Sequence, residues 1–98
     1  MTTITREHLE LAAKAAGYAT SWKEKFSYMA WPNNTCWNPH ICPADAWQLA
    51  ADCEMRIDFK GKYIKHSAGE FHYSDRFGGI TAAEAVTLAA AEIGRAMG

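Results

Sequence analysis

The sequence predicts an α+β fold in which a small antiparallel sheet of three to four strands is layered with three helices. Three segments, residues 5–16, 43–53 and 81–97, carry apolar side chains at the spacing of an amphipathic helix. Residues 54–74 instead alternate between apolar and polar side chains, which is typical of strands with one buried face. A chain of 98 residues can bury one hydrophobic core but not two, so residues 1–98 are expected to form a single domain.

The first element is predicted to be a helix over residues 5–16. Its apolar side chains recur at helical spacing: Leu9, Ala12, Ala13 and Ala16. Gly17 follows where a left-handed residue commonly ends a helix. Residues 18–25 are polar, and we expect them to be a connection without regular structure.

Residues 25–31 alternate between two sets of side chains and are predicted to form a strand, which Pro32 ends. From Pro32 to Pro43 the chain has no periodicity and contains three prolines, three asparagines, two cysteines, a tryptophan and a histidine. We therefore expect one long loop. Long loops within compact domains carry function more often than the elements they join.

A second helix is predicted over residues 43–53. Pro43 suits the first helical position, and Asp45 suits the first turn because its charge complements the helix dipole. The expected buried stripe of this helix consists of Ala46, Leu49, Ala50 and Cys53.

Residues 54–74 are predicted to form a β-meander. Met55, Ile57 and Phe59 alternate with charged side chains and should form the buried face of its first strand. Residues 62–66 return antiparallel after a turn at Gly61, although they could instead prolong the preceding strand. Residues 67–69 form a second turn, and residues 70–74 form the last strand, with its apolar positions at Phe71 and Tyr73. His66 and His72 lie on the polar side and are expected to be solvated.

The last helix begins after Thr81, which suits the N-cap position, and Glu84 completes a capping box three residues later. Ile80 is expected to pack on Ala85 as a hydrophobic staple. The predicted buried stripe of this helix consists of Val86, Ala89, Ala90, Ile93 and Met97.

Charge and hydropathy exclude several classes of function. The net charge is −1, and Lys60, Lys62 and Lys65 are expected to lie on an exposed strand face, so binding to nucleic acid is disfavoured. No segment approaches the roughly 20 apolar residues that span a bilayer, and the first residues have no apolar signal region. We therefore expect a cytoplasmic protein that does not contact membranes, with its three cysteines reduced.

Several short motifs, in this order, resemble the phage ABA sandwich family, short proteins of bacteriophages and prophages that are similar to the NinX family. The motifs are Trp37-Asn-Pro, Pro43-Ala-Asp-Ala-Trp47, the predicted strand from Met55 to Phe59, and the helix from Thr81 through Ile93-Gly-Arg-Ala-Met97. The resemblance implies helix, sheet and helix layers, a phage origin and therefore the host cytoplasm. It implies no catalytic residues. The segment from residue 33 to residue 41 is a departure, because its cysteine and histidine are not part of the family pattern.

Cys36, His40 and Cys42 form the one grouping of residue types in the loop that is typical of metal ligands. Structural zinc usually needs four ligands from two separate knuckles, and here Cys53 or His66 would have to supply the fourth. We therefore predict no metal and no cofactor, and we expect half-buried thiols.

The evidence for a catalytic site is equally weak. Cys36 or Cys42 with His40 or His72, oriented by Asp45, could form a nucleophilic site, but nothing selects these residues over others. The carboxylates that lie near one another in the sequence fit the solvated face of a helix and strand: Asp45, Asp52, Glu54 and Asp58. The sequence therefore predicts no catalytic residue and a protein that is not an enzyme.

Aromatic residues are the remaining indication of function, because they favour interfaces when they are partly exposed. Trp47 is interpreted as a core residue of the second helix. For Trp31 and Trp37, which flank the start of the loop, a contact surface and a core position remain equally open. The candidate binding residues are Trp31, Asn33, Asn34, Trp37, Asn38 and His40.

Two functions fit these observations. The first is a phage accessory protein that is not an enzyme and binds a host protein, for example as an anti-defence factor that inhibits CRISPR immunity. The second is a homo-oligomer that sequesters a small nucleotide-like immune signal, with bases stacked on aromatic rings and asparagines reading their polar edges. The lack of clustered Arg or Lys for a phosphate weakens the second hypothesis.

Overall fold

The computed structural model describes residues 4–25, 28–33, 35–67, 69–73 and 81–97. These residues form three helices and two small antiparallel sheets, which confirms the predicted α+β class. The elements, in chain order, are α1 (Arg6–Ala16), β1 (Ser21–Lys23), β2 (Tyr28–Ala30), α2 (Pro43–Asp52), β3 (Arg56–Asp58), β4 (Tyr63–His66), β5 (Gly69–His72) and α3 (Ala82–Ala96).

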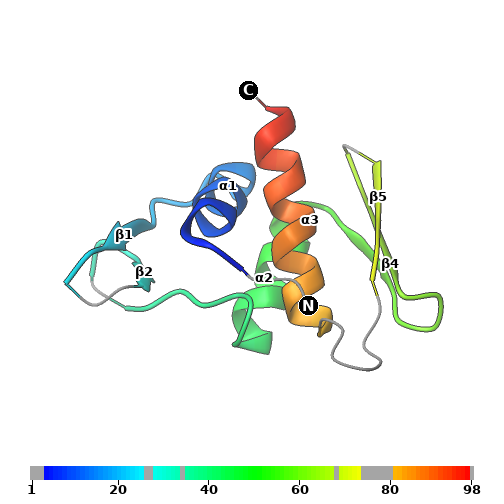
Figure 1. The fold of residues 1–98 in the computed structure, drawn as a ribbon, viewed down its shortest axis with the longest axis horizontal. Coiled ribbons are helices and arrows are strands. Elements are labelled where there is room, and N and C mark those ends of the chain that lie inside the picture. Colours follow the sequence, from blue (N-terminus) through cyan, green and yellow to red (C-terminus); the bar gives the residue numbers. More distant parts are fainter. Residues whose placement is uncertain (1–3, 26–27, 34, 68, 74–80, 98) are drawn as a thin grey trace.

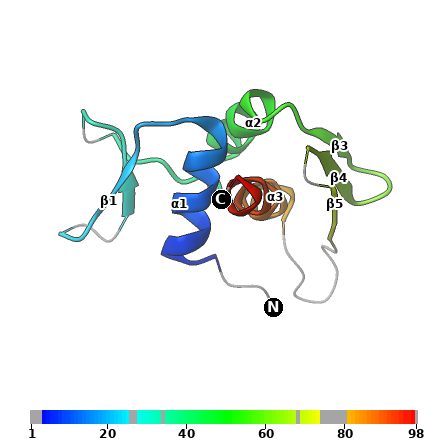
Figure 2. The ribbon, with the colours of Figure 1, turned by 90° about the horizontal axis from the view of Figure 1, so that it is seen from above.

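The helices lie between the two sheets. Figures 1 and 2 show the β1–β2 hairpin beside α1, and the β3–β4–β5 sheet on the opposite side of the molecule, next to α3. The layers therefore run sheet, helices, sheet, whereas the phage resemblance implies helix, sheet, helix. None of the helices in the described ranges is long and apolar enough to cross a membrane.

Helix α1 begins and ends as its sequence predicts. Thr5 is the N-cap: its hydroxyl accepts the backbone N–H of His8 at 3.3 Å, and the His8 ring accepts the N–H of Thr5 at 3.0 Å. Gly17 ends the helix at φ 72°, the left-handed conformation that glycine adopts without steric cost. Leu9, Ala12 and Ala13 are buried, so the apolar stripe faces the core.

Helix α3 begins with the predicted capping box. The Thr81 hydroxyl accepts the N–H of Glu84 at 3.1 Å, and the Glu84 carboxylate accepts the N–H of Thr81 at 3.0 Å. The helix is buried on almost every side because α1, α2 and the meander all contact it. The prediction that Met97 is buried is wrong: it lies after the last helical residue and is 58% exposed. The predicted staple at Ile80 lies outside the described residues.

Replacing Thr81 with alanine should destabilise the protein by about 1 kcal/mol, because the Glu84 N–H then loses its acceptor at the start of α3. Urea unfolding of wild type and variant measures the difference in free energy of unfolding. Thr81→Ser is the matched control, since serine keeps the accepting hydroxyl and should retain most of the stability. An alanine variant as stable as wild type would contradict the capping role.

The β3–β4–β5 sheet is the predicted meander. Residues 62–66 return antiparallel, as first expected, and the alternative of one prolonged strand is wrong. The register aligns Ile57, Ile64 and Phe71 across the three strands, and this row faces α3. Phe59 does not continue the buried face, because β3 ends at Asp58 and the Phe59 side chain is 54% exposed. Gly69, which was predicted in a turn, begins β5.

His66 is a second correction within the meander. It was expected to be solvated, but its side chain is fully buried and its Nε2 lies 3.1 Å from a carboxylate oxygen of Glu92 on α3. Position 66 shares the inward face of β4 with Ile64, so the fold turns it towards α3. His72 lies on the outward face and is 68% exposed, as predicted.

Of the β1–β2 hairpin, the sequence predicted one strand and missed the other. Strand β2 falls within the expected strand over residues 25–31, whereas β1 lies in the segment that was expected to be an irregular connection. The pairing Trp22↔Met29 defines this hairpin. Because β1 has only three residues, its sequence shows no periodicity that would distinguish it from a loop.

Candidate functional site

The loop after β2 is tied to the hairpin by backbone hydrogen bonds. The N–H of Trp37 donates to the carbonyl of Met29 at 2.9 Å, and the N–H of Trp31 donates to the carbonyl of Thr35 at 2.9 Å. Trp37 consequently points into the core: it is 2% exposed, and its ring lies 5.6 Å from the ring of Tyr18 in an edge-to-face contact. Of the two interpretations of Trp37, the structure shows the core position.

The other predicted loop residues are spread over different environments. Trp31 is half-buried, and its ring centroid lies 5.0 Å from that of Tyr18. Asn33 is exposed, and its side-chain oxygen accepts the N–H of Thr35 at 3.1 Å. Asn34 lies outside the described residues. Trp31 and Asn33 are thus partly engaged in holding the loop itself.

Asn38 is half-buried and also supports the loop. Its backbone N–H donates to the Asp45 carboxylate of α2 at 3.0 Å, and its side-chain amide donates to the Cys36 sulfur at 3.4 Å. Through this hydrogen bond Asp45, in the first turn of α2, holds the loop in place. The expectation that its carboxylate belongs to a solvated face is therefore incomplete. Among the described residues, no hydrogen bond joins His40 to Asp45, so the catalytic grouping considered for this loop is not assembled.

Of the predicted loop residues that the structure describes, His40 borders an open groove. Its ring is half-buried, and Nδ1 is buried without a hydrogen-bond partner within the described part of the chain. Burial lowers the pKa of His40, while the nearby Glu84 carboxylate opposes this shift. The lowered pKa favours the neutral imidazole at neutral pH.

The groove beside His40 has a volume of about 600 Å³ and a mostly apolar lining. Ile41, Pro43 and Trp47 form one wall, and residues 81–84 at the start of α3 form the other. Ile41 is 70% exposed and Trp47 is 41% exposed, which are large values for apolar side chains of this size. Such exposure is typical of contact surfaces.

The exposure of Trp47 corrects its assignment to the core. Residues 46, 49 and 50 of α2 are buried, and Trp47 lies about 100° around the helix from Ala46, at the flank of that stripe. There it meets Phe59 in an edge-to-face contact with the ring centroids 5.9 Å apart. Ile41, Trp47 and Phe59 form what we call the α2 apolar surface. The one sequence feature that could have indicated this surface is the position of Trp47 at the flank of the buried stripe of α2.

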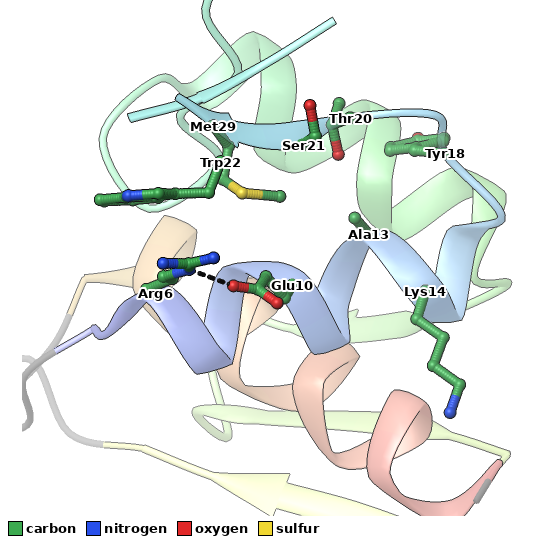
Figure 3. Close-up of a pocket in the computed structure, with 9 residues that line it drawn as sticks. All are labelled: Arg6, Glu10, Ala13, Lys14, Tyr18, Thr20, Ser21, Trp22 and Met29. Carbon is green, nitrogen blue, oxygen red and sulfur yellow. Dashed lines mark hydrogen bonds and ion pairs between the residues drawn. The ribbon is translucent and has the colours of Figure 1, made fainter. Parts of the chain in front are cut away.

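A second hollow, of about 410 Å³, lies between α1 and the β1–β2 hairpin. Figure 3 shows Arg6, Glu10 and Lys14 along α1 on one side, and Thr20, Ser21 and Trp22 along the hairpin on the other. The Thr20 hydroxyl oxygen is buried and has no hydrogen-bond partner among the residues described.

Two cations, Arg6 and Lys14, line this hollow, and in Figure 3 Lys14 points away from the hairpin, whereas Arg6 is already neutralised. The Arg6 guanidinium lies 5.5 Å from the centre of the Trp22 ring and pairs with both Glu10 and Glu24, the latter at 2.7 Å. An incoming phosphate would therefore meet two carboxylates beside Arg6. This hollow is better suited to a neutral polar ligand.

The three cysteines differ in their exposure. Cys36 is exposed, in contrast to its expected half-burial, whereas Cys42 and Cys53 are half-buried thiols. Burial raises the pKa of Cys53 to about 11, which keeps this thiol protonated at neutral pH. The described ranges bring no three His, Cys, Asp or Glu side chains together in a group that could hold a metal ion.

Comparisons of the chain with protein-family models, with curated proteins and with solved structures found no match. The resemblance to phage ABA sandwich proteins therefore stays a prediction. Within the described surface, the feature that differs most from an ordinary solvated surface is the α2 apolar surface, because large apolar side chains stay exposed there beside a groove.

Proposed function

We propose that this protein is not an enzyme and acts by binding another protein through the α2 apolar surface. The observation that carries the proposal is the exposed edge-to-face pair of Trp47 and Phe59. Tryptophan is enriched among the residues that dominate binding energy, particularly where neighbouring side chains exclude water from it. Ile41 and the adjoining groove supply such neighbours.

The resemblance to phage proteins makes a protein of the host cytoplasm the proposed partner. A phage accessory protein that acts on its host needs a surface for recognition and does not need a catalytic centre. We therefore propose an anti-defence role, with components of host immunity such as CRISPR effectors as the first partners to test. The nearly neutral charge of the chain agrees with a protein partner better than with nucleic acid.

Replacing Trp47 with alanine should weaken partner binding by about 30-fold or more while leaving the fold intact, because truncating a dominant interface residue commonly costs about 2 kcal/mol. Immobilised wild type and variant are compared for capture of proteins from lysate of a bacterial host. The captured partner is then purified, and its affinity for both proteins is measured.

Met97→Ala is the matched control for this experiment. Met97 is also a large, exposed apolar side chain, but it lies at the other end of α3 from the groove. The control should capture the same partner as wild type. Equal affinity of the wild type and the Trp47→Ala variant for the partner would contradict the proposed surface.

A second candidate function is binding of a small ligand by a homo-oligomer, and the hollow of Figure 3 favours it. The unpartnered Thr20 hydroxyl and the neighbouring Ser21 hydroxyl offer hydrogen bonds to a ligand, and the Trp22 ring lies at the same edge. Since Arg6 is already paired, the base of a nucleotide-like ligand suits this hollow better than its phosphate. Native mass spectrometry of the purified protein tests this function: a retained small mass on a symmetric oligomer supports it, and a bare monomer opposes it.

A further inference from the structure

We propose that the protein segment bound at the α2 apolar surface is acidic, with carboxylates that pair with Arg56 and Lys65 beside an apolar side chain that packs on Phe59. This inference rests on the proposed function and adds the chemistry of the partner. Its basis is a cationic hollow on the outward face of the meander that continues into the α2 apolar surface.

The first observation is the register of β3 and β4. It places Arg56 directly opposite Lys65, and like charges at such positions destabilise a sheet. Lys65 has one exposed carboxylate near it, Glu70 at 3.7 Å. Arg56 forms no ion pair with any residue that the structure describes. The guanidinium is therefore available to a carboxylate from outside, which it can bind through two parallel hydrogen bonds.

The second observation is that both cations line one hollow. It has a volume of about 420 Å³, and its lining also includes Asp58, Phe59 and Tyr63. Asp58 brings a negative charge, but its carboxylate accepts the N–H of Gly61 at 2.7 Å, and this bond lowers the pKa of Asp58 and holds the carboxylate in the turn.

The sequence around the hollow is locally basic. Residues 56–72 carry four Lys or Arg and two Asp or Glu, whereas the whole chain has a net charge of −1. The meander thus carries a net positive charge, although the net charge of the whole chain is negative. An acidic partner would approach this face faster than a neutral one, because complementary charge steers association.

Phe59 connects this hollow with the α2 apolar surface. Its ring lines the hollow and also contacts Trp47, and more than half of its surface is exposed. Aromatic side chains flanked by charged groups have the usual anatomy of a protein interface, with an apolar centre and a polar rim.

The same geometry disfavours other anions. Arg56, Phe59 and Lys65 are all exposed, so the hollow is too open to surround a free small anion. Nucleic acid binding depends on cations that neutralise several successive phosphates, and beyond the hollow the surface becomes apolar at Trp47. A polypeptide that combines carboxylates with an apolar side chain fits both parts.

The test uses a short synthetic peptide with leucine and phenylalanine flanked by glutamates, and a counterpart in which every glutamate is glutamine. Binding to the full chain is followed by NMR chemical-shift perturbation at low and at high salt. We expect the acidic peptide to bind about tenfold more tightly than its amide counterpart at low salt, to lose this advantage at high salt, and to shift the amides of β3 and β4.

Arg56→Glu should reduce the affinity for the acidic peptide at least tenfold and leave the amide peptide unaffected. Lys14→Glu is the matched control, because Lys14 is an exposed lysine on α1 and its reversal changes the net charge equally. It should bind the acidic peptide like wild type.

The proposal is overturned if the acidic peptide binds no better than the amide peptide, if Lys14→Glu weakens binding as much as Arg56→Glu, or if single-stranded oligothymidylate binds the hollow more tightly than the peptide. The failure of the acidic preference is distinguishable from failure of the proposed function. If only the acidic preference is wrong, Trp47→Ala still weakens binding of the partner protein while Arg56→Glu does not. If the proposed function is wrong, Trp47→Ala has no effect on partner binding.

Discussion

Replacing Trp37 with alanine is expected to lower the free energy of unfolding by about 3–5 kcal/mol, the range found for removal of large aromatic side chains from protein cores. Trp37 is 2% exposed, and its ring contacts the ring of Tyr18. The change removes the whole indole and leaves a cavity that the loop backbone, tied to Met29, cannot easily fill. Natural domains are commonly stable by about 5–15 kcal/mol, so the variant should be near its unfolding threshold.

Urea unfolding followed by circular dichroism measures this loss. Trp47→Ala is the matched control, because it removes the same side chain from an exposed position. Its cost should stay below about 1.5 kcal/mol, the contribution of a single aromatic pair. If Trp37→Ala is as stable as Trp47→Ala, Trp37 is not a core residue, and the loop again becomes the candidate contact surface.

Gly94→Ala is expected to destabilise the protein by about 3 kcal/mol, although alanine is the better helix former. In an open helix the substitution would stabilise by about 1 kcal/mol. Here a β-carbon at position 94 would lie 2.8 Å from the carbonyl carbon of Leu11 and closer still to its oxygen. Backbone atoms cannot move aside as a flexible side chain does, so α1 and α3 must separate. Overpacking of this kind typically costs about 1–3 kcal/mol, and the contact with backbone atoms places this site at the upper end.

Thermal and urea unfolding of Gly94→Ala test this packing. Gly17→Ala is the matched control: a β-carbon there meets no atom within 4 Å, so only its positive φ of 72° is penalised, by roughly 1 kcal/mol. We expect the loss at position 94 to be clearly greater. A Gly94→Ala variant that gained stability would show that α1 and α3 do not approach so closely.

The helices were predictable because their determinants are local. The hydroxyl of Thr81 and the carboxylate of Glu84 meet within one turn of chain, and the left-handed Gly17 needs no distant partner. The rows of buried apolar residues in α1 and α2 repeat every three to four positions, which is visible in a short window of sequence.

The short strands were less predictable because pairing defines them. Strand β1 consists of three residues and is a strand only because Trp22 lies opposite Met29. Phe59 alternates correctly with Ile57, yet β3 ends before it, so its ring turns to Trp47 and not to α3. Periodicity over so few residues cannot say where pairing stops.

The structure distributes the candidate binding residues of the loop over different environments, and their role in binding stays a prediction. His40 lies at the edge of the apolar groove, whereas Trp37 is a core residue and Trp47 is exposed. Trp37 was open to either position and Trp47 was expected in the core, and the structure reverses only the second expectation, because burial depends on which neighbours cover each ring. The position of Trp47 at the flank of the α2 stripe was the one local indication that its ring is exposed.

The sequence by itself determined the α+β class, the three helices, the caps at Gly17 and Thr81, and the order of the meander, because capping, spacing and alternation are properties of neighbouring residues. Only the tertiary structure decided that the helices lie between two sheets, that His66 pairs with Glu92, and that Arg56 faces Lys65 beside an exposed aromatic pair. Each of these depends on contacts between residues that are distant in sequence. Such contacts form only when the chain brings distant segments together, so they cannot be predicted from the pattern of neighbouring residues.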